Sequence, residues 1–169
     1  MAKIIYITGG QRSGKSSYAQ QLALSLSENP VYLATSRHWD DNYSERIKRH
    51  QDDRGPEWTN IEEEKFISNH DLSGKVVVMD CVTLWLTNFF FDLEQDIEKV
   101  LTAAKSELEK VSKQDCTLII ISNEIGMGGH PTHPTQMKFT DLQGWMNQYI
   151  GKKSDEAFLM VSGLPMKLK

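Results

Sequence analysis

Five short apolar runs, rich in β-branched residues, stand out from a more polar background. They read IIYIT (4–8), VYLA (31–34), VVVMD (76–80), TLIIIS (117–122) and AFLMVSG (157–163). Apolar side chains follow one another in these runs instead of alternating with polar ones. Such runs are typical of strands buried on both faces, as in a parallel sheet.

Between these runs, apolar residues spaced three or four apart predict helices over residues 16–26, 93–111 and 139–150. A further segment, TLWLTNFFF (83–91), is so apolar that we expect either a buried helix or a contact between subunits. The alternation of strands and helices predicts an α/β fold with a mostly parallel sheet. No linker, repeat or low-complexity tract divides the chain, so we expect 1–169 to form a single domain.

Composition and charge narrow the class of protein. The chain is 39% hydrophobic and 25% charged, and its net charge of −4 argues against nucleic-acid or anionic-membrane binding. No apolar run approaches the ~20 residues that span a bilayer, and the first residues lack a signal-peptide pattern. Cys81 and Cys116 lie beside apolar runs, which indicates buried free thiols in a reducing compartment. We therefore expect a cytoplasmic protein.

Residues 9–16 read GGQRSGKS and match the phosphate-binding pattern G-x-x-x-x-G-K-[ST] between an expected strand and an expected helix. The backbone N–H groups of such a loop and the N-terminus of the following helix face phosphate oxygens. We expect Lys15 to reach the β- and γ-phosphates and Ser16 to bind Mg²⁺. This loop predicts a P-loop NTPase of RecA-like, three-layer architecture. The expected nucleotide-binding residues are Gly9, Gly10, Gln11, Arg12, Ser13, Gly14, Lys15 and Ser16.

Asp80 ends the run VVVMD, where P-loop proteins place a carboxylate that binds Mg²⁺ directly or through water. Its side chain would alternatively cap the helix expected next in the chain. Glu124 follows another expected strand, and the carboxyl ends of parallel strands meet at one edge of a sheet. We therefore expect Asp80, Glu124 and the loop at 9–16 to face one crevice. No guanine-reading N-K-x-D motif is present, so kinase, switch and ATPase functions stay open at this point.

An ordered set of short blocks is more specific than any one of them. The chain contains, in this order, TGGQRSGKS (8–16), YLATS (32–36), ERIKRHQDDRGPEW (45–58), DCVTLWLTN (80–88), NEIGMG (123–128), NQ (147–148) and VSGLPMKLK (161–169). Together they resemble the bifunctional adenosylcobinamide kinase / adenosylcobinamide-phosphate guanylyltransferase family of cobalamin nucleotide-loop assembly. The resemblance extends from the first expected strand to the last residue.

The resemblance implies two reactions. ATP or GTP phosphorylates adenosylcobinamide, and GMP from GTP is then passed through a covalent guanylyl-histidine to adenosylcobinamide phosphate, giving adenosylcobinamide-GDP and pyrophosphate. The R-I-x-x-H block of the family is Arg46-Ile47-Lys48-Arg49-His50 here, so the carrier role falls on His50. A neutral imidazole is a good nucleophile near pH 7, and Arg46 would lie on the same helix face to neutralise phosphate charge. Without the resemblance, His50 would be interpreted as a surface residue.

The resemblance also implies a homo-oligomer, typically a trimer, with Mg²⁺ as cofactor. Residues 124–141 depart from the family pattern, because GMGGHPTHP and MKFTD replace an apolar, proline-containing stretch and an arginine-containing run. His130 and His133 lack Cys or carboxylate partners at ligand spacing, which favours a solvated loop over a metal site. We expect residues that contact the corrinoid in the irregular segments 52–75 and 124–137.

Two other functions stay open. The P-loop and Asp80 alone would also fit a single-function kinase for another small alcohol. The same P-loop with the apolar FFF run (89–91) would fit a non-catalytic, nucleotide-dependent switch or assembly subunit.

Overall fold

The central element is one sheet with strand order β3-β2-β4-β5-β1-β6-β7, seen in a computed structural model that describes residues 1–37 and 54–169. Neighbouring strands pair in parallel except β6 and β7, which are antiparallel. The predicted mostly parallel sheet is confirmed. The strands are β1 (Lys3–Gly9), β2 (Val31–Ala34), β3 (Thr59–Glu62), β4 (Val76–Asp80), β5 (Thr117–Ile121), β6 (Glu156–Val161) and β7 (Leu164–Lys167).

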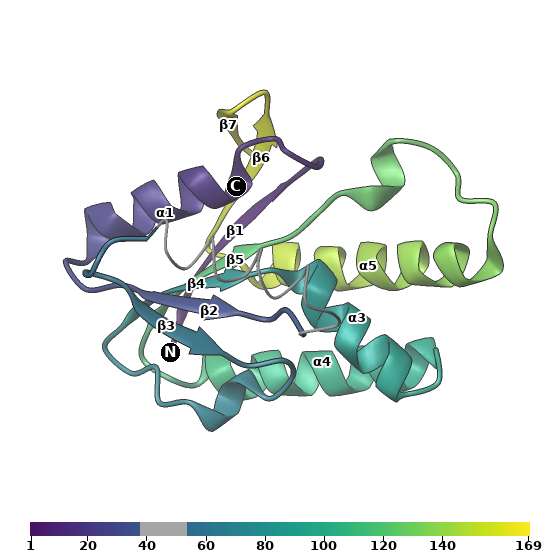
Figure 1. The fold of residues 1–169 in the computed structure, drawn as a ribbon, viewed down its shortest axis with the longest axis horizontal. Coiled ribbons are helices and arrows are strands. Elements are labelled where there is room, and N and C mark those ends of the chain that lie inside the picture. The colour runs from purple at the N-terminus through teal and green to yellow at the C-terminus, as the bar shows by residue number, and fades with distance from the viewer. Residues whose placement is uncertain (38–53) are drawn as a thin grey trace.

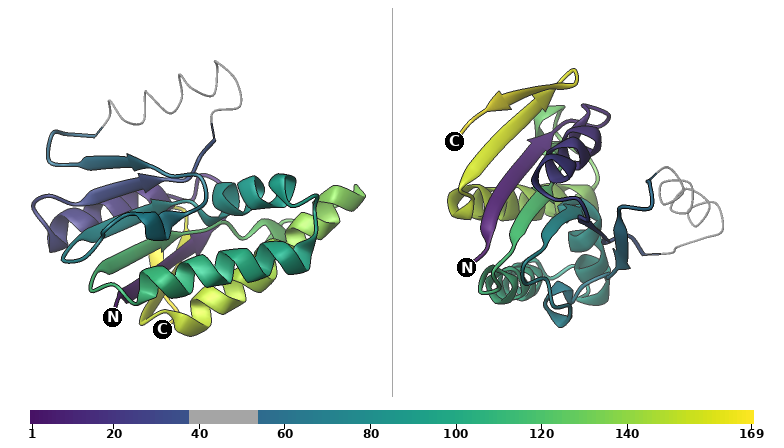
Figure 2. Two further views of the ribbon diagram at one scale, coloured as in Figure 1. Left: turned by 90° about the horizontal axis from the view of Figure 1, so that it is seen from below. Right: turned by 90° about the vertical axis from the view of Figure 1, so that its left-hand side faces the viewer.

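Helices cover both faces of the sheet and give the predicted three layers (Figures 1 and 2). Helix α1 packs on one face, and α3, α4 and α5 pack on the other. The α-helices are α1 (Lys15–Leu26), α3 (Val82–Asp92), α4 (Ile97–Ser112) and α5 (Pro134–Lys153), with short 3₁₀ turns at η1 (Ile67–Asn69) and η2 (Ile125–Met127).

The central strands are buried on both faces, as their continuous apolar runs predict. In β1, Ile4 and Tyr6 belong to the core beneath α3, α4 and α5. The alternate side chains Ile5 and Ile7 belong to the core beneath α1. Because successive side chains of a strand point to opposite faces, only a run that is apolar throughout fills both cores. Full burial of each such side chain contributes about 1.5–3 kcal/mol.

The apolar segment 83–91 forms most of helix α3, with Phe89 and Phe90 in the core and Phe91 52% exposed. The predicted start of the helix expected over 93–111 was wrong, because α4 begins only at Ile97. Asp96 caps that helix by accepting a hydrogen bond from the backbone N–H of Lys99 at 3.1 Å. Before α4, the chain turns at Glu94 and Gln95, which have φ of 54° and 61°.

Two strands and part of a helix were not expected from the sequence. Strand β3 lies in the irregular segment 52–75, and β7 forms an antiparallel hairpin with β6. Helix α5 begins earlier than position 139, because Pro134 occupies its first turn, where a missing N–H has no cost. Both cysteines are buried free thiols, as predicted. No helix among the described residues is long and apolar enough to cross a membrane.

Candidate active site

The P-loop connects β1 to α1 and is packed against the turn between β6 and β7. Gly9 has φ 153°, and a Cβ there would lie 2.7 Å from the carbonyl oxygen of Met160. Gly14 has φ 94°, and a Cβ there would lie 3.0 Å from Cα of Gly163. Glycine is therefore required at both positions, by the backbone conformation and by the close approach of β6 and the β6–β7 turn.

Lys15 is buried inside this loop, where its Nζ donates a hydrogen bond to the carbonyl oxygen of Gly10 at 2.5 Å. Burial lowers the pKa of Lys15, and the negative charge of the nearby Asp80 opposes that shift. The first turn of α1 adds backbone N–H groups that have no intrahelical partner. The loop thus places a cation and a set of amide donors where phosphate oxygens would bind.

Asp80 faces the P-loop from the end of β4. Its Oδ2 accepts hydrogen bonds from the Ser16 hydroxyl at 2.9 Å and from the Tyr32 hydroxyl at 2.5 Å. The alternative role as a helix cap is not observed, because the cap residue of α3 is Cys81 and no side chain caps that helix. Asp80 therefore lies beside the P-loop, at the expected phosphate site.

Ser16 and Asp80 are suited to hold Mg²⁺. Both supply oxygen atoms, and their hydrogen bond shows that these atoms reach a common point. Within residues 1–37 and 54–169, no group of three or more His, Cys, Asp or Glu side chains forms a metal cluster. Mg²⁺ in nucleotide sites needs no such cluster, since one or two protein oxygens, phosphates and waters complete its coordination.

Glu124 follows β5, the strand between β1 and β4, and is held by a polar network. Its Oε1 accepts hydrogen bonds from the Thr8 hydroxyl at 2.8 Å and from Asn147 Nδ2 at 3.2 Å. Asn147 in turn accepts hydrogen bonds from Ser122 at 2.7 Å and from Gln143 at 3.0 Å. Glu124, Asp80 and the P-loop lie at the carboxyl ends of three adjacent strands, the usual binding edge of an α/β sheet.

Arg54 adds a cation beside this group. Its guanidinium carbon lies 3.7 Å from the centroid of the Tyr32 ring, and its Nε donates to Asn60 Oδ1 at 2.9 Å. Tyr32 also packs against Trp58, with ring centroids 5.9 Å apart. Because Tyr32 binds Asp80, the Arg54 side chain is connected to the phosphate site through a single residue.

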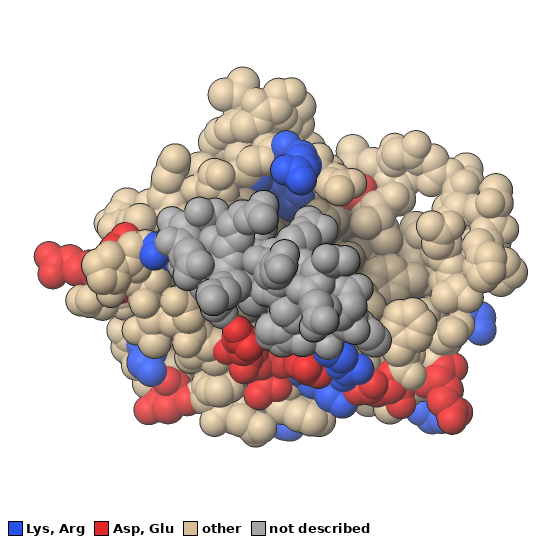
Figure 3. All heavy atoms as spheres, viewed as in Figure 1, with Lys and Arg blue, Asp and Glu red and all other residues tan. Residues whose placement is uncertain are grey.

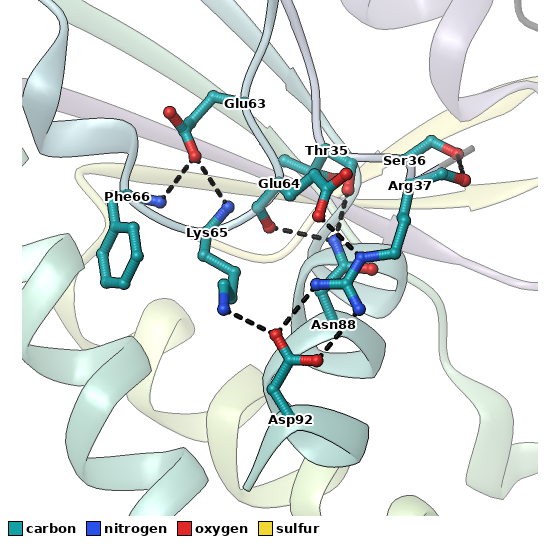
Figure 4. Close-up of polar contacts among 9 residues, drawn as sticks. All are labelled: Thr35, Ser36, Arg37, Glu63, Glu64, Lys65, Phe66, Asn88 and Asp92. Atoms are coloured by element: carbon teal, nitrogen blue, oxygen red, sulfur yellow. Dashed lines mark hydrogen bonds and ion pairs between the residues drawn. The ribbon is translucent and has the colours of Figure 1, made fainter. Parts of the chain in front are cut away.

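A second group of charged residues joins the carboxyl end of β2 to α3 through ion pairs and hydrogen bonds (Figure 4). Arg37 donates from Nε to Glu64 at 2.6 Å, and its two terminal nitrogens each donate to Asp92 at 2.9 Å. Lys65 donates to the same carboxylate at 2.5 Å. Hydrogen bonds from Arg37 and then from Lys65 hold the pKa of Asp92 far below its usual range. Asn88 on α3 adds a hydrogen bond to the carbonyl oxygen of Glu64 at 2.9 Å.

The residues predicted for phosphate binding lie together, as far as the structure describes them. Within the loop, Arg12 has φ 56°, and the buried Ser13 hydroxyl has no hydrogen-bond partner among the described residues. Arg46 and His50 lie outside the described residues. His133 caps α5, accepting a hydrogen bond at Nδ1 from a backbone N–H at 3.3 Å.

Several site residues were missed by sequence reasoning. Tyr32 lies in one apolar strand and Thr8 near the end of another, and each was marked only by its place at the start of an ordered sequence block. Asn147 lies on α5, and its role depends on packing against β5. The only signal for it was its presence in one of the ordered sequence blocks.

Comparison with known proteins gives the same assignment over the full chain. A family model described as cobinamide kinase / cobinamide phosphate guanyltransferase matches residues 5–168. The bifunctional adenosylcobalamin biosynthesis protein CobU of Escherichia coli K12 is 32% identical over 181 residues, covering 98% of this chain and 99% of the relative. The bifunctional adenosylcobalamin biosynthesis protein CobP of Pseudomonas aeruginosa PAO1 is 32% identical over 167 residues, covering 96% and 95%.

A structural comparison bears on the fold alone. A prototypical ATPase from a type III secretion system superposes with a TM-score of 0.52 at 11% identity, covering 93% of this chain and 50% of the ATPase. This likeness confirms the expected P-loop ATPase-like architecture. The family match and both relatives extend over nearly the entire sequence. The chain therefore belongs to the cobinamide kinase / cobinamide phosphate guanyltransferase family.

Proposed function

We propose that this protein phosphorylates adenosylcobinamide and then transfers GMP from GTP to the resulting phosphate. The observation that carries the proposal is the hydrogen bond from Ser16 to Asp80 beside the buried Lys15, in a chain that matches the family from end to end. That geometry fits phosphoryl transfer, and the relatives are named as bifunctional proteins of adenosylcobalamin biosynthesis.

In the kinase step, the P-loop amides and Lys15 hold the phosphates of ATP or GTP and offset the charge that develops on the transferred group. Mg²⁺, bound to Ser16 and to Asp80 directly or through water, would supply further positive charge to the phosphates. The acceptor hydroxyl attacks the γ-phosphorus, the bond to the β-phosphate oxygen breaks, and the hydroxyl proton leaves. Glu124 is oriented to accept that proton by Thr8 and Asn147.

In the second step, a His50 nitrogen attacks the α-phosphorus of GTP, a P–N bond forms and pyrophosphate leaves. A phosphate oxygen of the acceptor then attacks the same phosphorus and the P–N bond breaks. Arg54 follows His50 by four residues, a length of chain that spans at most about 14 Å. The contact of Arg54 with Tyr32 therefore supports a carrier near the P-loop, where Arg46 and other cations would offset α-phosphate charge.

We infer a homo-oligomer, a trimer by family resemblance, with part of the subunit contact made by exposed apolar side chains such as Trp145, which is 46% exposed. We infer a cytoplasmic location. Adenosylcobinamide, ATP and GTP are the partners, with no role for nucleic acid.

The test is capture of the covalent intermediate. Incubating the protein with α-labelled GTP and Mg²⁺ is expected to give an acid-labile, base-stable labelled protein, the stability pattern of a phosphoramidate. His50→Asn should abolish the label, because the nucleophile is removed. His130→Asn is the matched control and should keep the label, since that histidine lies in the loop before α5.

Each outcome separates the two activities. A label that persists in His50→Asn contradicts the carrier assignment. Phosphorylation of adenosylcobinamide without any protein label would leave a kinase alone, and the guanylyl-transfer half of the proposal would be wrong.

A further inference from the structure

Two surface hollows flank the first turns of α5, on the side of the molecule reached by α3. The first, which we call the α3–α5 hollow, has a volume of about 560 Å³ and is lined by Phe90, Phe91 and Phe139 with Gln95 and Gln136. The second, with a volume of about 460 Å³, shares Gln136 and Phe139 with the first. Both volumes lie within the range of about 300–1,000 Å³ that is usual for small-molecule sites.

Aromatic rings give the α3–α5 hollow its shape. Phe90 is buried in the core and contacts Phe91 and Phe139 edge-to-face, with ring centroids 5.7 Å and 5.3 Å apart. Phe91 is 52% exposed, so about half of this large apolar side chain is in contact with water. The rigid rings therefore leave an apolar surface that a ligand would cover.

Among the residues that the structure describes, the lining of both hollows contains no Lys, Arg, Asp or Glu, although such residues make up 25% of the chain. In Figure 3 the surface over the loop at 124–137 and the start of α5 is mostly tan, with charged side chains only at its margins. The polar side chains that line the α3–α5 hollow are chiefly Gln95, Gln136 and Thr87, together with Thr135 and His133. A nucleotide would need cations for its phosphates, so these hollows are not suited to a second nucleotide.

Helix α3 connects the α3–α5 hollow to the phosphate site. It begins at Val82, two residues after Asp80, and Thr83 in its first turn accepts a hydrogen bond from Asn123 at 3.0 Å. Thr87 lies one turn further along and lines the hollow. One helical turn advances about 5.4 Å, so the hollow begins a short distance from the phosphate site.

We propose that the α3–α5 hollow binds the corrin body of the acceptor, an inference that rests on the proposed function. A cobinamide combines a broad macrocycle with a methylated, apolar periphery and several neutral amide arms. The phenylalanine rings pack against the periphery, and the glutamine amides exchange hydrogen bonds with the amide arms. With the corrin held there, the arm that carries the hydroxyl group extends along α3 toward Lys15 and Asp80.

The experiment is equilibrium ultrafiltration of adenosylcobinamide, followed by its visible absorbance, with the full-length protein. Phe91→Ala and Gln136→Ala should each raise the dissociation constant roughly tenfold, as loss of a central contact does. Leu26→Ala is the matched control, because Leu26 is 49% exposed but lies at the end of α1 and does not line the hollow, and its dissociation constant should equal that of the wild type. Labelling by α-labelled GTP should be unchanged in all three variants.

The outcomes keep this inference separate from the proposed function. Dissociation constants for Phe91→Ala and Gln136→Ala that equal those of the wild type and of Leu26→Ala would place the corrinoid elsewhere and overturn the inference. A changed oligomer mass in Phe91→Ala with unchanged corrinoid binding would make the hollow a subunit contact, which also overturns it. Weakened binding in a protein that transfers no phosphate or GMP would keep the hollow as a corrinoid site and refute the proposed function. A wild-type protein that binds no adenosylcobinamide would refute both.

Discussion

Tyr32 is a positioning residue for Asp80, because its hydroxyl donates to the same carboxylate oxygen as Ser16. If Ser16 binds Mg²⁺, as proposed above, the Tyr32 hydrogen bond would still hold the carboxylate in place. Burial, and then the negative charge of Asp80, raise the pKa of Tyr32, so its phenol stays protonated and keeps donating at physiological pH. The Arg54 and Trp58 side chains pack on the ring and restrict its orientation.

We predict that Tyr32→Phe lowers the apparent affinity for Mg²⁺ in the phosphorylation reaction about tenfold, since groups that orient metal ligands have effects of this size. The free energy of unfolding should fall by only about 1–2 kcal/mol, because one hydrogen bond is lost and the ring remains. Titrating Mg²⁺ at saturating nucleotide and acceptor measures the first quantity, and thermal unfolding measures the second.

Tyr18→Phe is the matched control, because the Tyr18 ring packs against Phe158 on α1 and β6, away from Asp80. An unchanged Mg²⁺ requirement in Tyr32→Phe would show that the hydroxyl does not position the carboxylate.

At the level of secondary-structure elements, the Arg37 network holds the carboxyl end of β2 and the segment after β3 against α3 (Figure 4). The bidentate pair between Arg37 and Asp92 is a geometry that carries more energy than a single surface ion pair. Asn88 completes the junction with hydrogen bonds to the carbonyls of Thr35 and Glu64 at 2.7 and 2.9 Å. The N-terminal boundary of the segment that contains His50 is thereby fixed to the scaffold.

We predict that Asp92→Asn lowers the free energy of unfolding by about 1 kcal/mol at pH 7, a modest value because the carboxylate is partly exposed and screened by water. The pKa of Asp92 is lower in the folded protein than in the unfolded chain, so its contribution is present above about pH 4 and decreases as the pH falls below that value. The melting temperatures of wild type and variant should therefore differ by about 2–4 °C at pH 7 and converge toward pH 2.

Glu28→Gln is the matched control, because it removes an exposed carboxylate in the loop after α1. It should leave the melting temperature unchanged at pH 7 and at pH 2. A difference between wild type and Asp92→Asn that stays constant from pH 7 to pH 2 would mean that charge on Asp92 does not contribute.

The order of most elements was predictable because each signal is local. Continuous apolar runs identify β1, β2, β4, β5 and β6, since only doubly buried strands need them. Strand β3 reads TNIE with no buried residue, and β7 has four exposed residues, so neither carries a hydrophobic signal. Both are edge strands defined by pairing with a neighbour, which a single segment does not encode.

Across the whole molecule, the site joins segments that lie far apart in the sequence. The P-loop and Asp80 were predictable because a motif and a strand end mark them. Tyr32 and Asn147 depend on which strands and helices become neighbours, and nothing in their own segments indicates this. The contact between the P-loop and Gly163 is of the same kind. The carbonyl oxygen of Ser13 accepts a hydrogen bond at 2.9 Å from the N–H of Gly163, which lies 150 positions later in the chain.

The β6–β7 turn should consequently control the P-loop from the far end of the chain. Ser162 and Gly163 have φ of 51° and 80°, the conformation of a two-residue hairpin turn that requires left-handed backbone at both positions. Gly163→Ala strains this turn by about 1–2 kcal/mol and displaces the N–H that binds Ser13. We predict that the dissociation constant for GTP rises by up to about tenfold, measured by calorimetry.

Gly74→Ala provides the matched control, because Gly74 has φ 73° and, like Gly163, has no atom within 4 Å of an added Cβ. Both substitutions should lower the free energy of unfolding by a similar amount, about 1–2 kcal/mol, since the backbone strain is the same. Only Gly163→Ala should weaken GTP binding, because only that glycine donates to the P-loop. Equal GTP affinities in the two variants would mean that the C-terminal hairpin supports the fold but not the nucleotide site.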